Sequence, residues 1–163
     1  MTIRYNTQFI DDKDIKKVIQ SLKSDLITTG SYVDEFENKL KKKFKAMYCV
    51  ALSSGTAALH LSGLALEWNK KSHVITTPIT FAATANSALY LNSKLHLVDI
   101  NLQDYTLDLN LLEDKLKRIR YISSELISII GVDYAGYPCD WRSINFLSKK
   151  YKAFLINDNC HSI

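Results

Sequence analysis

The feature that most constrains the fold is a series of five short apolar runs separated by stretches with helical periodicity. Each run is as long as a strand and apolar throughout, which is typical of strands buried on both faces of a sheet. The intervening stretches, at 56–66, 81–90, 111–119 (begun by Asn110) and 141–151 (begun by Asp140), repeat apolar residues as a helix does. This β-α alternation predicts an α/β fold with a doubly wound, mostly parallel sheet. The apolar runs are residues 48–52, 73–76, 95–99, 126–132 and 153–158.

The residues before position 48 have a different rhythm that predicts two helices. Asp11 and Asp12 precede a stripe of apolar residues at i, i+3, i+4 and i+7, with the acidic residues at the positive end of the helix. Ser31 followed by Asp34 resembles a capping box that begins the second helix. We therefore expect an N-terminal helical segment over 1–47 and an α/β domain over 48–163.

Composition excludes several classes of protein. The 21 Lys and Arg residues against 17 Asp and Glu give a net charge of +4, spread along the chain, so no nucleic-acid partner is expected. The basic cluster at 41–45 lies on an amphipathic helix and is interpreted as a solvated face. No apolar run is long enough to span a membrane and the first residues lack a signal-peptide core, which favours a cytoplasmic protein without a membrane partner. Three widely spaced cysteines argue against disulfides or a structural zinc site.

Two of the predicted strand-to-helix turns carry candidate ligand-binding residues. The turn at 53–57 contains Gly55, Thr56 and Ala57, where a helix N-terminus would offer free N–H groups to a phosphate. An ordinary capped turn explains this segment equally well. After the next strand, Phe81 begins a helix and could stack on a flat ligand, although an aromatic residue there is more often part of the core. No G-x-G-x-x-G motif occurs, which disfavours a nicotinamide cofactor.

The last apolar run ends on Asp158, with His161 about one turn beyond. The carboxylate falls at the sheet edge where ligands bind in open α/β folds, and a buried charge there requires a partner. A structural carboxylate that caps a loop is the alternative. A nucleophilic pair of Cys160 and His161 is disfavoured because adjacent residues do not readily face each other. A metal site from Asp158, Cys160 and His161 would need a distant fourth ligand.

These segments, in this order, resemble the N-terminal part of the DegT/DnrJ/EryC1/StrS sugar aminotransferases, enzymes of the aspartate-aminotransferase fold (type I) that use pyridoxal 5'-phosphate. The resemblance covers nearly the whole chain. Its motifs are the helix after Asp11-Asp12, Leu26-Ile27-Thr28-Thr29-Gly30, the 53–61 segment Ser-Ser-Gly-Thr-Ala-Ala-Leu-His-Leu, Thr77-Pro78, Val98-Asp99, the 132–140 segment Val-Asp-Tyr-Ala-Gly-Tyr-Pro-Cys-Asp, and 158–161.

The resemblance implies a role for each candidate residue. Gly55, Thr56 and Ala57 would cradle the cofactor phosphate, and Phe81 would lie on one face of the pyridine ring. Asp158 would contact the ring nitrogen and His161 the ring hydroxyl. A carboxylate at the ring nitrogen keeps it protonated, so that the ring can accept electrons during transamination.

One element of the family pattern is absent from this sequence. The family carries a Schiff-base lysine downstream of the Asp-x-x-His segment, whereas no lysine follows Lys152 here. We therefore expect a chain truncated before that lysine, with no catalytic residue of its own and inactive when alone.

The resemblance also implies substrates and partners. The expected reaction moves an amino group from glutamate to a nucleotide-linked 4-keto-6-deoxy sugar, in a homodimeric enzyme. The segments at 77–86 and 134–140 look most like the branch that acts on UDP-4-amino-4,6-dideoxy-N-acetyl-beta-L-altrosamine, in pseudaminic acid synthesis. Two alternatives remain: an inactive or non-enzymatic fragment, and an NAD-dependent nucleotide-sugar epimerase or dehydratase.

Overall fold

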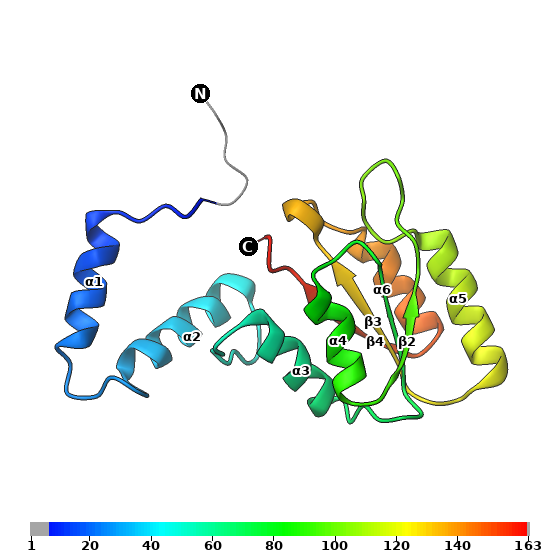
Figure 1. Cartoon of the computed structure of the whole chain (residues 1–163), viewed down its shortest axis with the longest axis horizontal. Coiled ribbons are helices and arrows are strands. Elements are labelled where there is room, and N and C mark those ends of the chain that lie inside the picture. Colours follow the sequence, from blue (N-terminus) through cyan, green and yellow to red (C-terminus); the bar gives the residue numbers. More distant parts are fainter. Residues whose placement is uncertain (1–6, 163) are drawn as a thin grey trace. The chain divides into compact units, whose positions relative to one another are not determined.

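The computed structural model describes residues 7–162 and divides the chain into two compact units, Met1–Ala51 and Leu52–Ile163 (Figure 1). The first unit contains helices α1 (Asp12–Leu22) and α2 (Ser31–Phe44). The second contains every strand in the described part of the chain. The expected domain boundary at residue 48 stays a prediction, since compactness alone does not define a domain.

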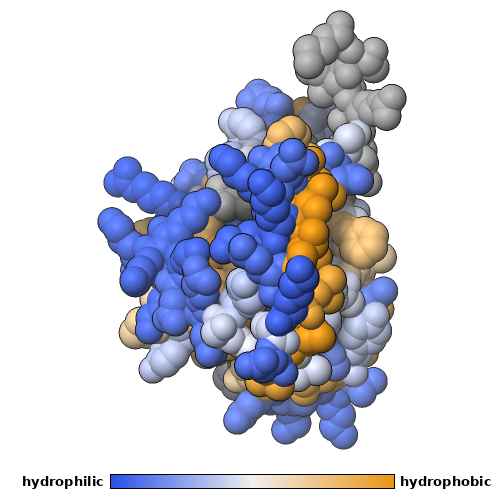
Figure 2. All heavy atoms as spheres, turned by 90° about the vertical axis from the view of Figure 1, so that its left-hand side faces the viewer, coloured by the Kyte–Doolittle hydropathy of each residue, from blue (hydrophilic) through white to orange (hydrophobic). Residues whose placement is uncertain are grey.

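The two helices of the first unit form where the sequence pattern places them, but only one is capped as expected. The Asp11 side chain accepts hydrogen bonds from the N–H groups of Lys13 and Asp14, which completes a capping box at the start of α1. The capping box predicted at Ser31 is wrong: Gly30 is the N-cap of α2 and supplies no side-chain bond, so Ser31 is already helical. Figure 2, which faces the side where Figure 1 draws α1, shows an apolar strip beside hydrophilic residues.

The apolar run at 48–52 is not a strand, which corrects the first of the five strand predictions. Its residues have no regular structure, and Tyr48 and Val50 are 84% and 71% exposed. A strand requires a neighbour that pairs with its backbone. Here the N–H of Ala51 donates instead to a side chain, Glu37 Oε1, at 2.7 Å. An apolar run of this length indicates a strand only where a second strand lies beside it.

The second unit is an α/β structure in which strands and helices alternate as predicted. Its four strands lie in the order β2-β1-β3-β4, and every pair is parallel. The predicted fold class is therefore confirmed. The strands are β1 (His73–Thr76), β2 (Lys94–Leu97), β3 (Ile127–Val132) and β4 (Ala153–Asp158), and the helices are α3 (Gly55–Ala65), α4 (Ala82–Tyr90), α5 (Leu109–Ile122) and α6 (Trp141–Lys150), with a short 3-10 helix η1 (Tyr134–Gly136).

The sheet is covered by helices on both faces because successive strand residues point to opposite sides. In β1, Ile75 packs with the apolar residues of α5 and α6, whereas its neighbour Val74 packs with those of α3 and α4. Ile129 and Ile130 of β3 divide in the same way. Burial on both faces was expected of every strand, but it holds only for β1 and β3, because β2 and β4 are the outer strands of the described sheet.

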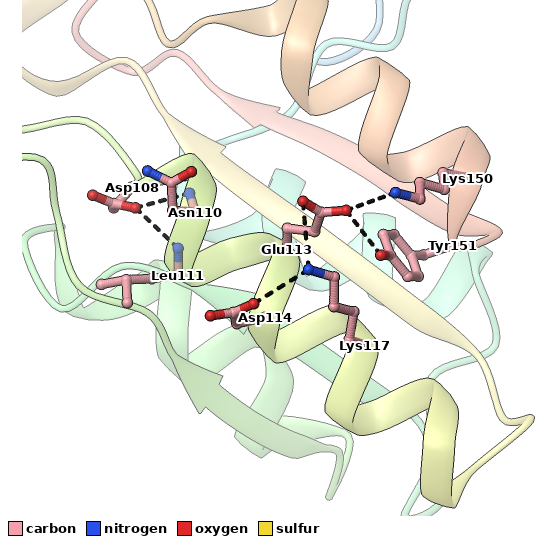
Figure 3. A network of polar contacts seen from close by, with 8 residues as sticks. All are labelled: Asp108, Asn110, Leu111, Glu113, Asp114, Lys117, Lys150 and Tyr151. Carbon is pink, nitrogen blue, oxygen red and sulfur yellow. Dashed lines mark hydrogen bonds and ion pairs between the residues drawn. The ribbon is translucent and has the colours of Figure 1, made fainter.

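Helix α5 begins two residues earlier than predicted and is tied to α6 by a polar network. Its N-cap is Asp108, whose carboxylate accepts from the N–H groups of Asn110 and Leu111, so the expected start at Asn110 is wrong. Farther along, Glu113 Oε1 accepts from Lys150 Nζ at 2.7 Å and from the Tyr151 hydroxyl at 2.9 Å (Figure 3). Exposed pairs of this kind contribute little to stability, and this one mainly fixes the approach of the two helices.

Two histidines form a hydrogen-bonded pair between β1 and β2. His73 Nδ1 lies 2.9 Å from His96 Nε2, and the two rings are within 8° of parallel. Such a contact requires one nitrogen to donate and the other to accept, so only one proton fits between them. Burial, together with the nearby charges of Lys94 and Arg120, lowers the pKa of His73. The pKa of His96 is lowered to about 4 by burial and by the electrostatic effect of His73, Lys115 and Lys94.

We expect this histidine pair to make the chain less stable at acid pH. The folded state favours the neutral rings, whereas an unfolded histidine titrates near pH 6.5, at about its ordinary pKa. The contribution of the pair is therefore complete above that pH and is lost as the pH falls toward 4. Melting temperatures at pH 7.5 and pH 5 should differ less in a His73→Phe/His96→Leu variant than in the unaltered chain. An equal difference in both proteins would show that carboxylates alone cause the acid sensitivity.

Candidate functional site

A cavity of about 240 Å³ lies in the second unit, lined by residues near the carboxyl ends of β3 and β4 and the N-termini of α3 and α4. Open α/β sheets bind ligands at this edge. Five of the six candidate residues line the cavity: Gly55, Thr56, Phe81, Asp158 and His161. The sixth, Ala57, does not line it. The structure therefore brings together residues that are separated by up to about a hundred positions in the sequence.

The N-terminus of α3 presents free backbone N–H groups to this cavity. Ser54 caps the helix, its hydroxyl accepts from the N–H of Ala57 at 3.2 Å, and its carbonyl accepts from the N–H of Ala58 at 3.1 Å. Ala57 is thus engaged in the cap itself. The N–H groups of Gly55 and Thr56 have no acceptor among the hydrogen bonds of residues 7–162. Free N–H groups and the helix dipole together favour an anion here.

Gly55 leaves room that any other residue would fill. A Cβ atom at this position would lie 2.7 Å from Cys160 Sγ, far inside van der Waals contact. The absence of a side chain lets the 158–161 segment approach the start of α3 closely. The turn between β4 and the end of the described chain therefore forms one wall of the cavity.

Asp158 is the last residue of β4 and contributes a buried carboxylate to the cavity. Its side chain is 8% exposed, and its Oδ2 accepts from the Thr84 hydroxyl at 2.7 Å. The second oxygen, Oδ1, has only a long contact of 3.4 Å with the N–H of Cys160. No Lys, Arg or His side chain within residues 7–162 forms an ion pair with this carboxylate. A buried, unpaired charge favours a cationic or hydrogen-bond-donating ligand group.

His161 and Phe81 lie at other parts of the cavity wall. The Nδ1 atom of His161 accepts from the N–H of Ala135 at 3.2 Å, so the neutral ring carries its proton on Nε2 and can donate from that atom. Phe81 is the N-cap residue of α4, and its ring is 74% exposed. A large, exposed aromatic ring beside a cavity is suited to stacking on a flat ligand.

Cys160 lies in the same wall but is a poor nucleophile. A hydrogen bond to Asp158, together with burial and the charge of that carboxylate, raises the pKa of the Cys160 thiol to about 11. The thiol is therefore protonated at neutral pH, whereas nucleophilic cysteines have a lowered pKa. No group of three His, Cys, Asp or Glu side chains in the described part of the chain is arranged to hold a metal ion.

The sequence did not identify three polar residues that shape this cavity. Thr80 and Thr84 line it, and their hydroxyl oxygens are 2.8 Å apart. Asp133, which is 5% exposed, accepts through Oδ1 from the Cys139 N–H and from Trp141 Nε1, both at 3.0 Å. Asp133 directly follows the expected run 126–132, much as Asp158 ends the last run, and this similarity was the signal that the sequence offered. The threonines gave none, because Thr80 lies in a turn rich in hydroxyl residues and Thr84 lies inside a helix.

Comparisons with known proteins identify the class of this fold and site. The profile of the DegT/DnrJ/EryC1/StrS aminotransferase family matches residues 8–163. The chain therefore belongs to this family, whose cofactor is pyridoxal phosphate. The membership implied by the sequence motifs is confirmed.

Individual relatives agree with the family assignment. The chain is 38% identical over 161 residues to the UDP-4-amino-4,6-dideoxy-N-acetyl-beta-L-altrosamine transaminase of Campylobacter jejuni. The aligned region covers 99% of this chain and 42% of that protein. A putative sugar aminotransferase of Streptococcus pneumoniae, solved in its PMP form, matches with a TM-score of 0.85 at 26% identity, over 99% of this chain and 43% of the other. NtdA of Bacillus subtilis with bound cofactor PMP matches with a TM-score of 0.82 at 29% identity, over 94% of this chain and 35% of the other.

The matched region is only part of these relatives. The chain spans about two-fifths of the length of the curated relatives it matches. Among the helices of residues 7–162, none combines the length and apolar character that a membrane span requires.

Proposed function

We propose that residues 1–163 are the N-terminal part of a pyridoxal-phosphate-dependent aminotransferase that transfers an amino group from glutamate to a nucleotide-linked 4-keto-6-deoxy sugar. The observation that carries this proposal is the cavity around Asp158. It combines an unpaired carboxylate, an exposed aromatic ring and a helix N-terminus with free N–H groups. These are the three kinds of group that a phosphorylated, protonated pyridine requires.

The residues fit the cofactor part by part. The N–H groups of Gly55 and Thr56 would hold the phosphate at the N-terminus of α3. Phe81 would lie against one face of the ring. Asp158 would accept the proton of the ring nitrogen, and Nε2 of His161 would donate to the ring hydroxyl oxygen. When bound, the cofactor supplies an electron sink for the carbon that loses its proton.

Asp158 would contribute through its charge. A carboxylate in a buried setting keeps a neighbouring ring nitrogen protonated, because the ion pair is weakly screened there. His161 would keep the ring oriented, and the 158–161 segment would close one wall of the cavity against water. Ala57, whose N–H is bonded to Ser54, would support the cradle from behind instead of contacting the phosphate itself.

Binding of the cofactor by this chain gives a direct test. Titration with pyridoxal phosphate should shift the absorbance spectrum of the ligand and saturate at one site per chain. No lysine follows Lys152, so borohydride reduction and peptide mapping should find no single stoichiometric pyridoxyl-lysine. Saturable binding without such an adduct supports the proposal. No saturation at millimolar ligand would contradict it for this chain and favour the alternative of a non-enzymatic fragment.

The narrower proposal is that the amino acceptor belongs to pseudaminic acid synthesis. It is supported by the 38% identity to the altrosamine transaminase of Campylobacter jejuni. We expect a protein that joins this chain to the remaining three-fifths of such an enzyme to aminate the UDP-linked 4-keto sugar of the L-altro series faster than its D-gluco epimer. A wrong epimer would leave buried polar groups unpaired, at about 1–3 kcal/mol each. Paired assays with glutamate as donor decide this, and a preference for the D-gluco sugar would place the protein in a sibling branch.

We also infer the oligomeric state and the domain organisation. The protein would form a homodimer, as the family resemblance implies. It would consist of a helical segment over 1–47 and the first part of the cofactor-binding domain over 48–163. The dinucleotide-dependent epimerase or dehydratase considered as an alternative has less support, because the family profile covers residues 8–163 and the sequence lacks a glycine-rich fingerprint.

A further inference from the structure

The carboxylate of Asp158 has one short hydrogen bond within the described chain, and it comes from Thr84. The Thr84 hydroxyl lies 2.7 Å from Oδ2, whereas the contact of Oδ1 with the Cys160 N–H is 3.4 Å. Thr84 has no exposed surface and Asp158 is 8% exposed, so water cannot easily replace this bond. The Cys160 thiol, which also contacts Asp158, is a weak donor, so the orientation of the carboxylate depends mainly on the Thr84 hydroxyl.

The direction of the adjoining hydrogen bond follows from counting protons. An ionised carboxylate can only accept, so Thr84 must give its one hydroxyl proton to Asp158. The 2.8 Å contact between Thr80 Oγ1 and Thr84 Oγ1 then has Thr80 as the donor. The result is a one-way chain of hydroxyls that starts at the cavity wall, where Thr80 lies, and ends on Asp158.

The position of Thr84 in α4 makes this donor rigid and links it to the rest of the cavity. Thr84 lies in the first turn of the helix, and its N–H donates to the carbonyl of Phe81 at 3.0 Å. Because threonine is β-branched, its side chain in a helix is confined to two main χ1 rotamers. The turn that carries the exposed aromatic ring therefore also holds the hydroxyl that orients the carboxylate.

We propose that Thr84, held by Thr80, is a positioning residue that turns Oδ1 of Asp158 toward the ring nitrogen of the cofactor. This proposal rests on the proposed function. With Oδ2 occupied by Thr84, Oδ1 is the oxygen with free lone pairs for a ligand. Loss of the hydroxyl would let the carboxylate rotate and leave a buried charge without its donor.

The test compares two ligands that differ only at the ring nitrogen. Pyridoxal phosphate carries the nitrogen, and its 1-deaza analogue has carbon in that place. We expect Thr84→Val to weaken binding of pyridoxal phosphate by roughly tenfold and binding of the deaza analogue by less than about twofold, since one hydrogen bond to a charged group is at stake. Thr84→Ser keeps the hydroxyl and should restore most of the preference for pyridoxal phosphate.

Thr80→Val provides a second variant that leaves the Thr84 hydroxyl and the carboxylate in place. It should reduce the preference for pyridoxal phosphate in the same direction and by less. The positioning role would be overturned if Thr84→Val weakened the binding of both ligands equally and Thr80→Val changed neither affinity. Thr84 would then have a purely structural role. Failure of the unaltered chain to bind pyridoxal phosphate would instead contradict the proposed function, and this inference with it.

Discussion

Asp158→Ala should lower the affinity of the chain for pyridoxal phosphate by roughly a hundredfold. The substitution removes the carboxylate at the end of β4 that would contact the ring nitrogen in the proposed site, and a buried charge-assisted bond is worth about 1.5–3 kcal/mol. A loss of 2.7 kcal/mol corresponds to about a hundredfold in the dissociation constant. Spectroscopic titration of the two proteins at pH 7.5 measures the difference. Asp158→Asn, which keeps the shape and removes the charge, should lose nearly as much.

The matched control is Cys160→Ala in the same segment. Its thiol is protonated at neutral pH, because the hydrogen bond to Asp158, together with burial, raises the pKa of Cys160 to about 11, and a thiol is only a weak donor to that carboxylate. Removal of the sulfur also keeps the space beside Gly55 open. The affinity for pyridoxal phosphate should therefore change by less than about threefold. Equal losses in the two variants would mean that the pyridine ring does not lie against Asp158.

The sequence predicted residues that line one cavity because the ends of strands follow from simple patterns. A charged residue at the end of an apolar run falls at the carboxyl edge of a parallel sheet, and this placed Asp158 correctly at that edge. Turn residues before a helix placed Gly55 and Thr56 in the same way. Thr84 could not be predicted from such a pattern, because it lies inside a helix. Its neighbours along the chain do not indicate that its hydroxyl donates to a carboxylate 74 positions away.

The errors in the predicted fold arise where local structure depends on contacts that a short stretch of sequence does not contain. The run at 48–52 has the composition of a strand, but pairing depends on a partner that a local pattern does not contain. The capping signal at Ser31 satisfied the spacing rule, yet Gly30 is the N-cap and Ser31 is already the first helical residue. Helix and strand interiors, by contrast, are set by periodicity, which is why the four strands of the sheet were located to within a few residues.

Arg120 is expected to be the polar side chain whose loss most destabilises the second unit. It lies in the last turn of α5, and its guanidinium donates to three backbone carbonyls: Tyr151 at 2.7 Å, Glu125 at 2.7 Å and Lys152 at 2.8 Å. These carbonyls belong to the segments that lead into β3 and β4. Burial lowers the pKa of Arg120, but the group stays charged at all accessible pH values. One side chain therefore holds two chain segments at the start of neighbouring strands.

Arg120→Met retains much of the aliphatic stem and removes all three bonds. Hydrogen bonds from a charged group contribute about 1.5–3 kcal/mol each and are not additive, so we expect the free energy of unfolding to fall by about 3 kcal/mol. Arg118→Met on the same helix is the control. Because Arg118 is exposed, its replacement should lower the free energy of unfolding by less than about 0.5 kcal/mol. Urea unfolding curves at pH 7.5 give both values, and similar losses for the two variants would mean that water satisfies the three carbonyls in place of Arg120. Since these carbonyls precede the strands and the cavity lies at their opposite ends, the folded Arg120→Met chain should bind pyridoxal phosphate as tightly as the unaltered one.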